Sequence, residues 1–93
     1  MLKGKSALIT GASRGIGRAI ASLFADQGCD IAFTYIYEDK EAEELTKQLQ
    51  EKGIKVLCIN SDAANFEAAH QVIEQTIKAF GKLDILVCNA GIA

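Results

Sequence analysis

Four short apolar runs alternate with three amphipathic segments, and this alternation constrains the fold more than any other feature of the chain. The runs at 5–10, 30–35, 56–60 and 83–89 have the length and composition of strands. The segments at 15–27, 41–52 and 65–80 have helical spacing, and a glycine follows each, the usual end of a helix. The alternation predicts an α/β fold with a doubly wound parallel sheet, in which right-handed crossovers give the strand order 3-2-1-4.

The same patterns predict which side chains are buried. The strands are nearly continuous in apolar residues, which is typical of strands covered on both faces. Each of two helices carries five apolar residues at helical offsets, and we expect these faces to pack on the sheet. They are Ile16, Ala19, Ile20, Leu23 and Phe24 in the first helix, and Ala69, Val72, Ile73, Ile77 and Phe80 in the third.

Composition excludes several classes of protein. The chain has 93 residues, of which 49% are hydrophobic and 24% charged, and this balance is that of a folded globular protein. The net charge is −2 and no basic block is present, so we expect neither a nucleic acid nor a membrane surface as a partner. No apolar run approaches the length of a signal peptide or a membrane span.

The cysteine and histidine content points to a reducing compartment and to no metal. Cys29, Cys58 and Cys88 are far apart in apolar surroundings, so we expect reduced, buried thiols and a cytoplasmic location. His70 is the only histidine and has no cluster of ligands around it, which predicts that no metal is bound.

The first apolar run ends in a glycine-rich turn, Gly11-Ala12-Ser13-Arg14-Gly15-Ile16-Gly17, which opens into a helix. Glycines let a pyrophosphate approach the free N–H groups of a helix N-terminus, where the helix dipole favours negative charge. The spacing differs from Gly-x-Gly-x-x-Gly because position 20 is Ile, and no Gly-Lys-Ser/Thr follows. The turn predicts a nucleotide ligand, and the alternative is a turn with glycines for steric reasons only.

Two polar residues follow later strands and should lie beside this turn. Asp62 comes after the third strand and Asn89 after the fourth, so both belong to the carboxyl edge, where doubly wound sheets bind ligands. Asp62 could accept a hydrogen bond from an adenine amino group, and the small Ala90 and Gly91 leave room for a ribose. One alternative is that the Asp62 carboxylate is only a charge partner for a helix N-terminus. The other is that Asn89 only holds the turn together.

These motifs, with the run from Leu83 to Gly91, resemble the classical short-chain dehydrogenase/reductase family, and the turn most resembles that of 3-oxoacyl-[acyl-carrier-protein] reductases. The resemblance covers essentially the whole chain and implies a Rossmann-type fold. It implies that Gly11, Gly15 and Gly17 cradle the pyrophosphate, that Asp62 holds adenine, and that residues 89–91 line the ribose. The expected cofactor-binding set is Gly11, Ser13, Arg14, Gly15, Ile16, Gly17, Tyr35, Asp62, Ala63, Asn89, Ala90 and Gly91.

One position departs from the family and another is assigned a structural role. The family usually has Asn-Asn-Ala-Gly after the fourth strand, and Cys88 replaces the first of these asparagines. A thiol is a poor hydrogen-bond partner, so the role of that side chain is lost here. We interpret Asp84, near the start of the same strand, as structural, because it lies at the edge opposite the chemistry.

The residue after the second strand predicts the choice of dinucleotide. NAD-binding proteins carry an acid at this point, and Tyr35 stands there, while Glu38 and Asp39 come later in the loop. Without that acid a 2′-phosphate meets no repulsion, and the Arg14 guanidinium can pair with it. We therefore expect NADP(H), unless Arg14 is only a solvated loop charge.

The resemblance implies a catalytic serine and a Tyr-x-x-x-Lys, but neither tyrosine fits that pattern, and the serines at 6, 13, 22 and 61 belong to a strand, the turn, a helix and a strand end. Asp39 is the fourth residue after Tyr35, and Glu41 is the fourth after Tyr37. We therefore expect residues 1–93 to be the amino-terminal, dinucleotide-binding part of a single Rossmann domain whose catalytic part is absent. An unpaired fourth strand, where a fifth would normally pair, supports this expectation.

The resemblance implies a parent enzyme of fatty-acid synthesis that uses NADPH to reduce a 3-oxo group carried on acyl carrier protein. It also implies a homo-oligomer, commonly a tetramer. Two alternatives stay open. The parent could be a short-chain reductase for a sugar, a steroid or a small alcohol, or the chain could be a non-catalytic nucleotide-binding half-fold.

Overall fold

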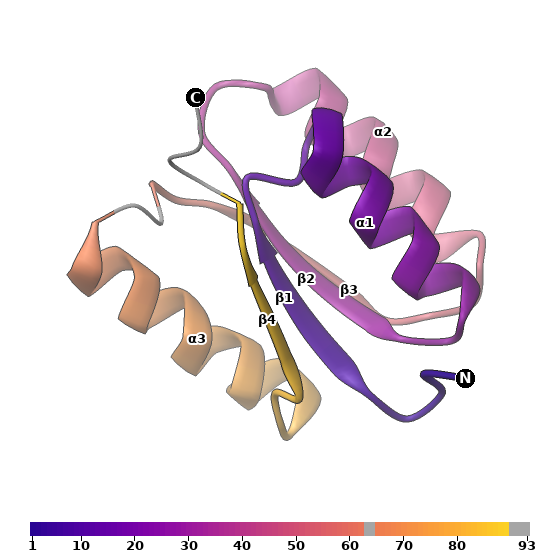
Figure 1. The fold of residues 1–93 in the computed structure, drawn as a ribbon. Coiled ribbons are helices and arrows are strands. Elements are labelled where there is room, and N and C mark those ends of the chain that lie inside the picture. The colour runs from indigo at the N-terminus through magenta and orange to yellow at the C-terminus, as the bar shows by residue number, and fades with distance from the viewer. Residues whose placement is uncertain (63–64, 90–93) are drawn as a thin grey trace.

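The computed structural model, which describes residues 1–62 and 65–89, has one parallel sheet with helices on both faces (Figure 1). The strands are β1 (Ser6–Thr10), β2 (Asp30–Tyr35), β3 (Val56–Asn60) and β4 (Ile85–Cys88), and the helices are α1 (Gly15–Asp26), α2 (Asp39–Gln50) and α3 (Phe66–Phe80). The order β3-β2-β1-β4 confirms the predicted 3-2-1-4 sheet. Helices α1 and α2 cover one face and α3 covers the other.

The helix boundaries follow local capping signals. Helix α2 begins at Asp39, two residues before the predicted start, because Asp39 and Glu41 favour the positive end of the helix dipole. It ends at Gln50, before a turn that leads to Gly53. Helix α3 begins after Asn65, whose side-chain oxygen accepts a hydrogen bond from the Ala68 N–H at 3.2 Å.

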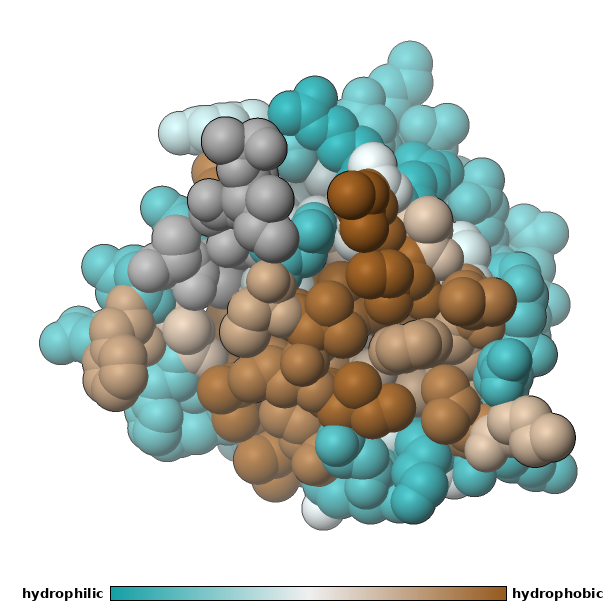
Figure 2. All heavy atoms as spheres, viewed as in Figure 1, coloured by the Kyte–Doolittle hydropathy of each residue, from teal (hydrophilic) through white to brown (hydrophobic). Residues whose placement is uncertain are grey.

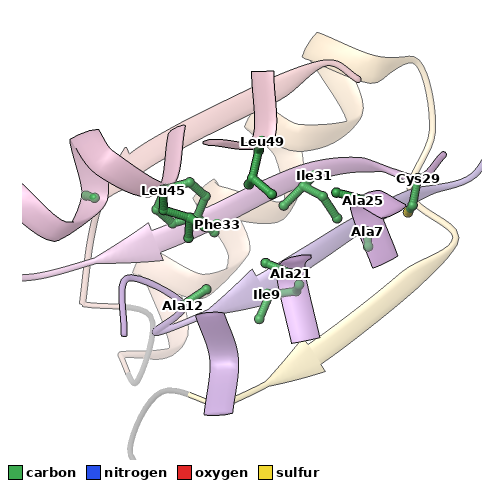
Figure 3. Close-up of a cluster of buried hydrophobic side chains, with 11 residues drawn as sticks. Ala7, Ile9, Ala12, Ala21, Ala25, Cys29, Ile31, Phe33, Leu45 and Leu49 are labelled. Atoms are coloured by element: carbon green, nitrogen blue, oxygen red, sulfur yellow. The ribbon is translucent and has the colours of Figure 1, made fainter. Parts of the chain in front are cut away.

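The main core lies between the sheet and the pair α1 and α2 (Figure 3). Ile31 and Phe33 from β2 meet Leu45 and Leu49 from α2, and all four side chains are fully buried. A smaller cluster on the α3 side is built on Leu8, Ala32 and Val72. Because the two central strands supply both clusters, β1 and β2 are the strands that the helices cover best.

The predicted contact face of α1 is wrong by about one position. The buried residues are Gly17, Ala21 and Ala25, whereas Ile16 is 71% exposed and Leu23 is 58% exposed. Small side chains let this helix approach the sheet closely, and the larger Ile20 and Phe24 pack only partly against the core. The spacing of the large apolar residues does not reveal this face, because glycine and alanine make it.

The outer strands are less buried than their sequences predict. Both β3 and β4 lie at edges of the sheet and are only half covered, and Leu86 of β4 is 46% exposed. In α3 only Val72 and Thr76 are buried, and Ile77 is 43% exposed, so the predicted five-residue face of this helix is only partly packed. Figure 2 shows hydrophobic side chains gathered over β4, between α1 and α3. The predicted open edge at the fourth strand is present in the part of the chain that the structure describes.

Asp84 has the structural role that the sequence indicated. Its Oδ2 atom accepts a hydrogen bond from the Ser6 N–H at 2.9 Å, and its own N–H donates to the Ser6 carbonyl at 3.0 Å. The Ser6 hydroxyl donates to the Lys82 carbonyl at 2.7 Å. These bonds fix the start of β1 against the segment that leads into β4, at the edge away from the glycine turn.

The expectation of three buried thiols is wrong. Cys29 is buried, Cys58 is half-buried, and Cys88, which ends β4 at the sheet edge, is exposed. Burial, helped by the nearby carboxylates of Asp30 and Asp84, raises the pKa of the Cys29 thiol to about 11. Burial also raises the pKa of the Cys58 thiol.

The rate of alkylation should distinguish the exposed thiol from the buried one. We expect iodoacetamide to modify Cys88 first in the folded chain, because a thiol must be accessible and ionised to react. Cys29 should react only after unfolding in denaturant. Mass spectrometry of peptides from a time course gives the order, and early modification of Cys29 would contradict the packing described above.

Leu45→Ala should destabilise the chain strongly. It removes a fully buried side chain from the core between α2 and β2, and we expect the free energy of unfolding to fall by about 2–5 kcal/mol. Leu23→Ala is the matched control, because Leu23 is exposed, and it should change stability by less than about 0.5 kcal/mol. Urea unfolding followed by circular dichroism measures both, and equal losses would contradict the assigned core.

Candidate functional site

The glycine-rich turn leaves β1 at the carboxyl edge of the sheet, and the end of β2 holds it in place. The Gly11 N–H donates to the Thr34 hydroxyl at 2.9 Å, and the Ala12 N–H donates to the Thr34 carbonyl at 3.1 Å. Gly11 and Gly15 have φ angles of +68° and +66°, the left-handed region that side chains disfavour. The turn therefore needs glycine at both positions and has a fixed shape.

Gly17 is where α1 passes closest to the turn and to the end of β4. A Cβ atom there would lie 2.7 Å from the Gly11 carbonyl oxygen and 2.7 Å from Nδ2 of Asn89. Because such distances are too short for any real contact, only glycine fits. The predicted Gly17 thus has a steric role that brings the start of α1 against the strands.

Asn89 ties the turn to β4. Its side-chain amide donates to the Gly11 carbonyl at 2.9 Å, and its backbone N–H donates to the Thr10 hydroxyl at 2.9 Å. Asn89 therefore joins the turn to β4, and its predicted contact with a ribose stays a prediction. Ala63, Ala90 and Gly91, the other predicted residues on this edge, lie outside the described residues.

The N-terminus of α1 has the features of an anion-binding site. Arg14 is the N-cap residue in an extended conformation and is exposed, and no side chain within the described residues caps the helix. The first turn of α1 has no acidic residue, in contrast to α3, whose N-terminus is capped by Asn65 and carries Glu67. Since free N–H groups and the helix dipole favour negative charge, this end of α1 fits a phosphate group.

Tyr35 and Asp62 lie on the same edge of the sheet, farther along it. Tyr35 ends β2, is half-buried and is paired in register with Asn60 of β3. The Ser61 N–H donates to the Tyr35 carbonyl at 3.0 Å, which continues the ladder to the start of the loop that contains Asp62. Asp62 is exposed, and its carbonyl accepts a hydrogen bond from the Asn65 N–H at 3.1 Å. The Asn65 side chain caps α3, and the predicted contact of Asp62 with adenine stays a prediction.

Glu38 contacts the turn, although the sequence suggested only a loop position. It is the N-cap residue of α2, but its side chain caps nothing and instead reaches the turn. The Ser13 hydroxyl donates to its Oε1 at 2.7 Å, and the Tyr37 N–H donates to its Oε2 at 3.3 Å. Ser13, a predicted site residue, is fully buried at this contact.

The surroundings of Glu38 keep it ionised. The hydrogen bond from Ser13, with smaller contributions from the Tyr37 N–H and the charge of Arg14, holds the pKa of the Glu38 carboxyl below its usual value. A carboxylate therefore lies beside the turn at neutral pH. The sequence places Glu38 in the loop, three residues after the end of β2. Nothing about that position predicts a contact with the turn.

Arg18 and Thr34 are further residues of the site that the sequence argument missed. The Arg18 guanidinium donates to the Ser13 carbonyl at 3.2 Å through Nη1 and to Oε1 of Gln48 at 3.2 Å through Nη2. It thereby joins α1, the turn and α2. Arg18 is one turn into a helix and Thr34 is inside a strand, so only the packing of α1, α2 and β2 brings them to the turn.

Other kinds of site find little support in the described residues. A groove of about 610 Å³ lies between α2 and β3, but of the predicted residues it contains only Tyr35. Residues 1–62 and 65–89 contain no group of three His, Cys, Asp or Glu side chains placed to hold a metal. Among the same residues no helix has the length and hydrophobicity needed to cross a membrane.

Comparison with known proteins agrees with the fold and the turn. The short chain dehydrogenase family matches residues 5–93. General stress protein 39 of Bacillus subtilis is 48% identical over 97% of this chain, and 3-oxoacyl-[acyl-carrier-protein] reductase FabG of Staphylococcus aureus is 41% identical over 95%. L-rhamnose 1-dehydrogenase (NAD(P)(+)) of a Sphingomonas strain is 37% identical over 99%. The chain spans 32%, 36% and 36% of the lengths of these relatives, about a third of each.

Solved structures of related proteins match nearly the whole chain. A short chain dehydrogenase from Burkholderia cenocepacia in complex with NADP has a TM-score of 0.94 and 43% identity, with 98% of this chain and 37% of that one covered. A blue fluorescent protein from a metagenomic library in complex with NADPH has a TM-score of 0.92 and 44% identity, with 98% and 38% covered.

Gly17→Ala should disturb both the fold and the turn. The added methyl group must displace the Gly11 carbonyl and the Asn89 side chain, which we expect to cost about 1–3 kcal/mol of stability. The displaced turn should bind ADP about tenfold more weakly, as for the loss of one good hydrogen bond. Calorimetric titration with ADP and thermal unfolding measure the two effects.

Gly53→Ala is the control for this substitution. Gly53 has a φ of +82° with open space around it, far from the turn. We expect it to cost about 1 kcal/mol through backbone strain and to leave ADP binding unchanged. Normal ADP binding by Gly17→Ala would show that the close approach at Gly17 is not needed for the ligand.

Proposed function

The chain belongs to the short chain dehydrogenase family, and on this premise we propose that it forms the amino-terminal, NADP(H)-binding part of a reductase of fatty-acid synthesis. The proposed substrate is a 3-oxoacyl group carried on acyl carrier protein, reduced to the 3-hydroxyacyl form. The proposed setting is the cytoplasm, and the proposed parent protein is a homo-oligomer, a tetramer by family resemblance.

One observation supports the dinucleotide role above all others. The start of α1 is glycine-lined, has no side-chain cap among the described residues and is held rigidly by Thr34 and Asn89. A rigid set of free N–H groups binds a pyrophosphate without a large cost of ordering the loop. The cofactor-binding roles of Gly11, Gly15 and Ile16 in the turn follow as part of the proposal, with Asp62 directed to adenine.

The choice of NADP(H) rests on residues near the ends of the turn and of β2. Arg14 is exposed at the N-cap of α1, and Tyr35 takes the place of the acid that NAD-binding proteins use. Two structural neighbours at 43% and 44% identity were solved with NADP and NADPH. Both observations favour a cofactor with a 2′-phosphate.

The bound cofactor would supply the hydride for reduction of the carbonyl. The residues of this chain would bind the pyrophosphate at α1 and orient the adenosine along the edge formed by β2 and β3. Proton transfer is assigned to residues outside this chain, because neither tyrosine precedes a lysine by four positions. The exposed apolar surface over β4 would then be covered by the remainder of the protein.

The second candidate is a short-chain dehydrogenase for a sugar. The 37% identity to L-rhamnose 1-dehydrogenase favours it, because this value is close to the 41% shared with the 3-oxoacyl reductase. A longer protein that carries this sequence should oxidise NADPH with acetoacetyl-CoA if the first proposal is correct. Reduction of NADP⁺ with L-rhamnose and no turnover of acetoacetyl-CoA would favour the second, and absorbance at the NADPH band distinguishes them.

Arg14→Gln should weaken NADPH binding selectively. Loss of a charged hydrogen bond to the 2′-phosphate should raise the Kd for NADPH by about 10- to 100-fold and leave the Kd for NADH nearly unchanged. Lys40→Gln, which removes an exposed charge of the same sign from α2, is the control and should change neither. Parallel fluorescence titrations give the four constants, and tighter binding of NADH than NADPH by the unmodified chain would overturn the cofactor choice.

A further inference from the structure

Strand β3 is an edge of the sheet that carries no protective feature. It lies at the edge opposite β4, and within residues 1–62 and 65–89 only β2 pairs with it. Exposed edge strands normally carry a charged residue, a proline or a bulge, which prevents another strand from pairing. Residues 56–59 include neither a charge nor a proline, their register with β2 is continuous, and all four are half-buried.

The backbone of β3 has donors and acceptors on its open side. Towards β2, the Ile31 N–H donates to the Lys55 carbonyl and the Ser61 N–H donates to the Tyr35 carbonyl, both at 3.0 Å. Because a parallel pair uses every second residue of a strand, the odd-numbered residues of this segment direct their backbone groups to β2. The backbone groups of the even-numbered residues, with Cys58 at the centre, therefore point away from the sheet, where an added strand would bind them.

A groove lies on each face of this edge. The groove of about 610 Å³ between α2 and β3 contains Cys58 and Asn60. A second groove, of about 430 Å³, lies between β3 and α3 and contains the same two residues. Successive side chains of an extended strand point to opposite faces of a sheet. A strand added at β3 would therefore place alternate side chains in the two grooves.

The two grooves differ in charge. The groove beside α2 is lined by Asp39, Glu43 and Lys47, so its carboxylates outnumber its ammonium group. Among the described residues that line the groove beside α3, only Lys78 is charged. All four charged side chains are exposed. A basic side chain therefore complements the groove beside α2, and an acidic side chain complements the groove beside α3.

We propose that β3 is a docking edge for an extended peptide segment of a partner protein. The segment pairs with the open side of β3, with basic side chains on the face beside α2 and acidic side chains on the face beside α3. Backbone hydrogen bonds supply affinity, and the two grooves supply specificity. The inference does not depend on the proposed cofactor, and it uses the edge of the sheet opposite the apolar surface at β4.

Two peptides of equal composition test the charge pattern. In extended form, Thr-Lys-Glu-Val-Val-Lys-Glu-Thr has its lysines on one face and its glutamates on the other. In Thr-Lys-Lys-Val-Val-Glu-Glu-Thr both faces carry both charges, whatever the register. We expect the first peptide to bind the chain about tenfold more tightly, as for two or three exposed charge contacts. Titration followed by NMR gives both Kd values, and equal affinities or no binding of either peptide would overturn the proposal.

Cys58→Pro tests the backbone contact. It removes an N–H that points away from β2, and proline is tolerated in an edge strand at such a position. We expect the first peptide to bind at least about tenfold more weakly, because a donor is lost and the proline ring occupies the docking side. Cys58→Val keeps the N–H and should change the Kd less than about twofold. Circular dichroism verifies folding, and equal Kd values for the two folded variants would contradict the proposed pairing.

Glu43→Lys tests the groove beside α2 without any change to the backbone. Loss of the carboxylate and gain of a positive charge should weaken binding of the first peptide about fivefold. Glu44→Lys is the matched control, because Glu44 is an exposed carboxylate of the same helix that does not line the groove. It should change the Kd less than about twofold, and equal effects of the two substitutions would remove the groove from the proposal.

Amide hydrogen exchange locates the contact. Bound peptide should slow exchange of the Cys58 N–H and leave exchange of the Leu57 N–H, which faces β2, nearly unchanged. Slower exchange in β4 with no change in β3 would place the peptide at the other edge and overturn the proposal. Sedentary pairing of two copies is tested by analytical ultracentrifugation without peptide. A dimer that Cys58→Pro converts to a monomer would make a second copy the occupant and would also overturn it.

Discussion

The close approach of α1 to the ends of β1 and β4 is the constraint on which the rest of the site depends. Gly17 allows this approach, because any Cβ at this position would overlap Gly11 and Asn89. The Asn89 amide then joins the turn to β4 across 78 residues of sequence. With the turn fixed in this way, the N–H groups at the start of α1 have a defined direction, and a phosphate group meets a site that is already formed.

Charges of both signs meet at the turn. The N-terminus of α1 and Arg14 are positive, and the Glu38 carboxylate lies beside them, held by Ser13. Arg18 connects the turn to α2 through Gln48. The N-terminal end of α1 is therefore bordered by a carboxylate of the protein as well as by positive charge.

The second notable feature of the described residues is exposed apolar surface at the open edge strand β4. Large apolar side chains are exposed on β4, α1 and α3, among them Leu86, Leu23 and Ile77. These side chains contribute little to the present core, because they are 46%, 58% and 43% exposed, respectively. An unpaired strand next to apolar side chains is a surface that proteins normally cover.

The sequence alone determined the alternation of elements, the order 3-2-1-4 and the place of the turn, because these follow from local periodicity, glycine positions and the handedness of crossovers. Most boundaries were within two residues of the prediction, since caps such as Asn65 are local signals. The buried face of α1, the exposure of Cys88 and the contact of Glu38 with Ser13 were decided only by the tertiary structure. They depend on how closely one element packs on another and on which distant side chains meet, and no short stretch of sequence carries that information.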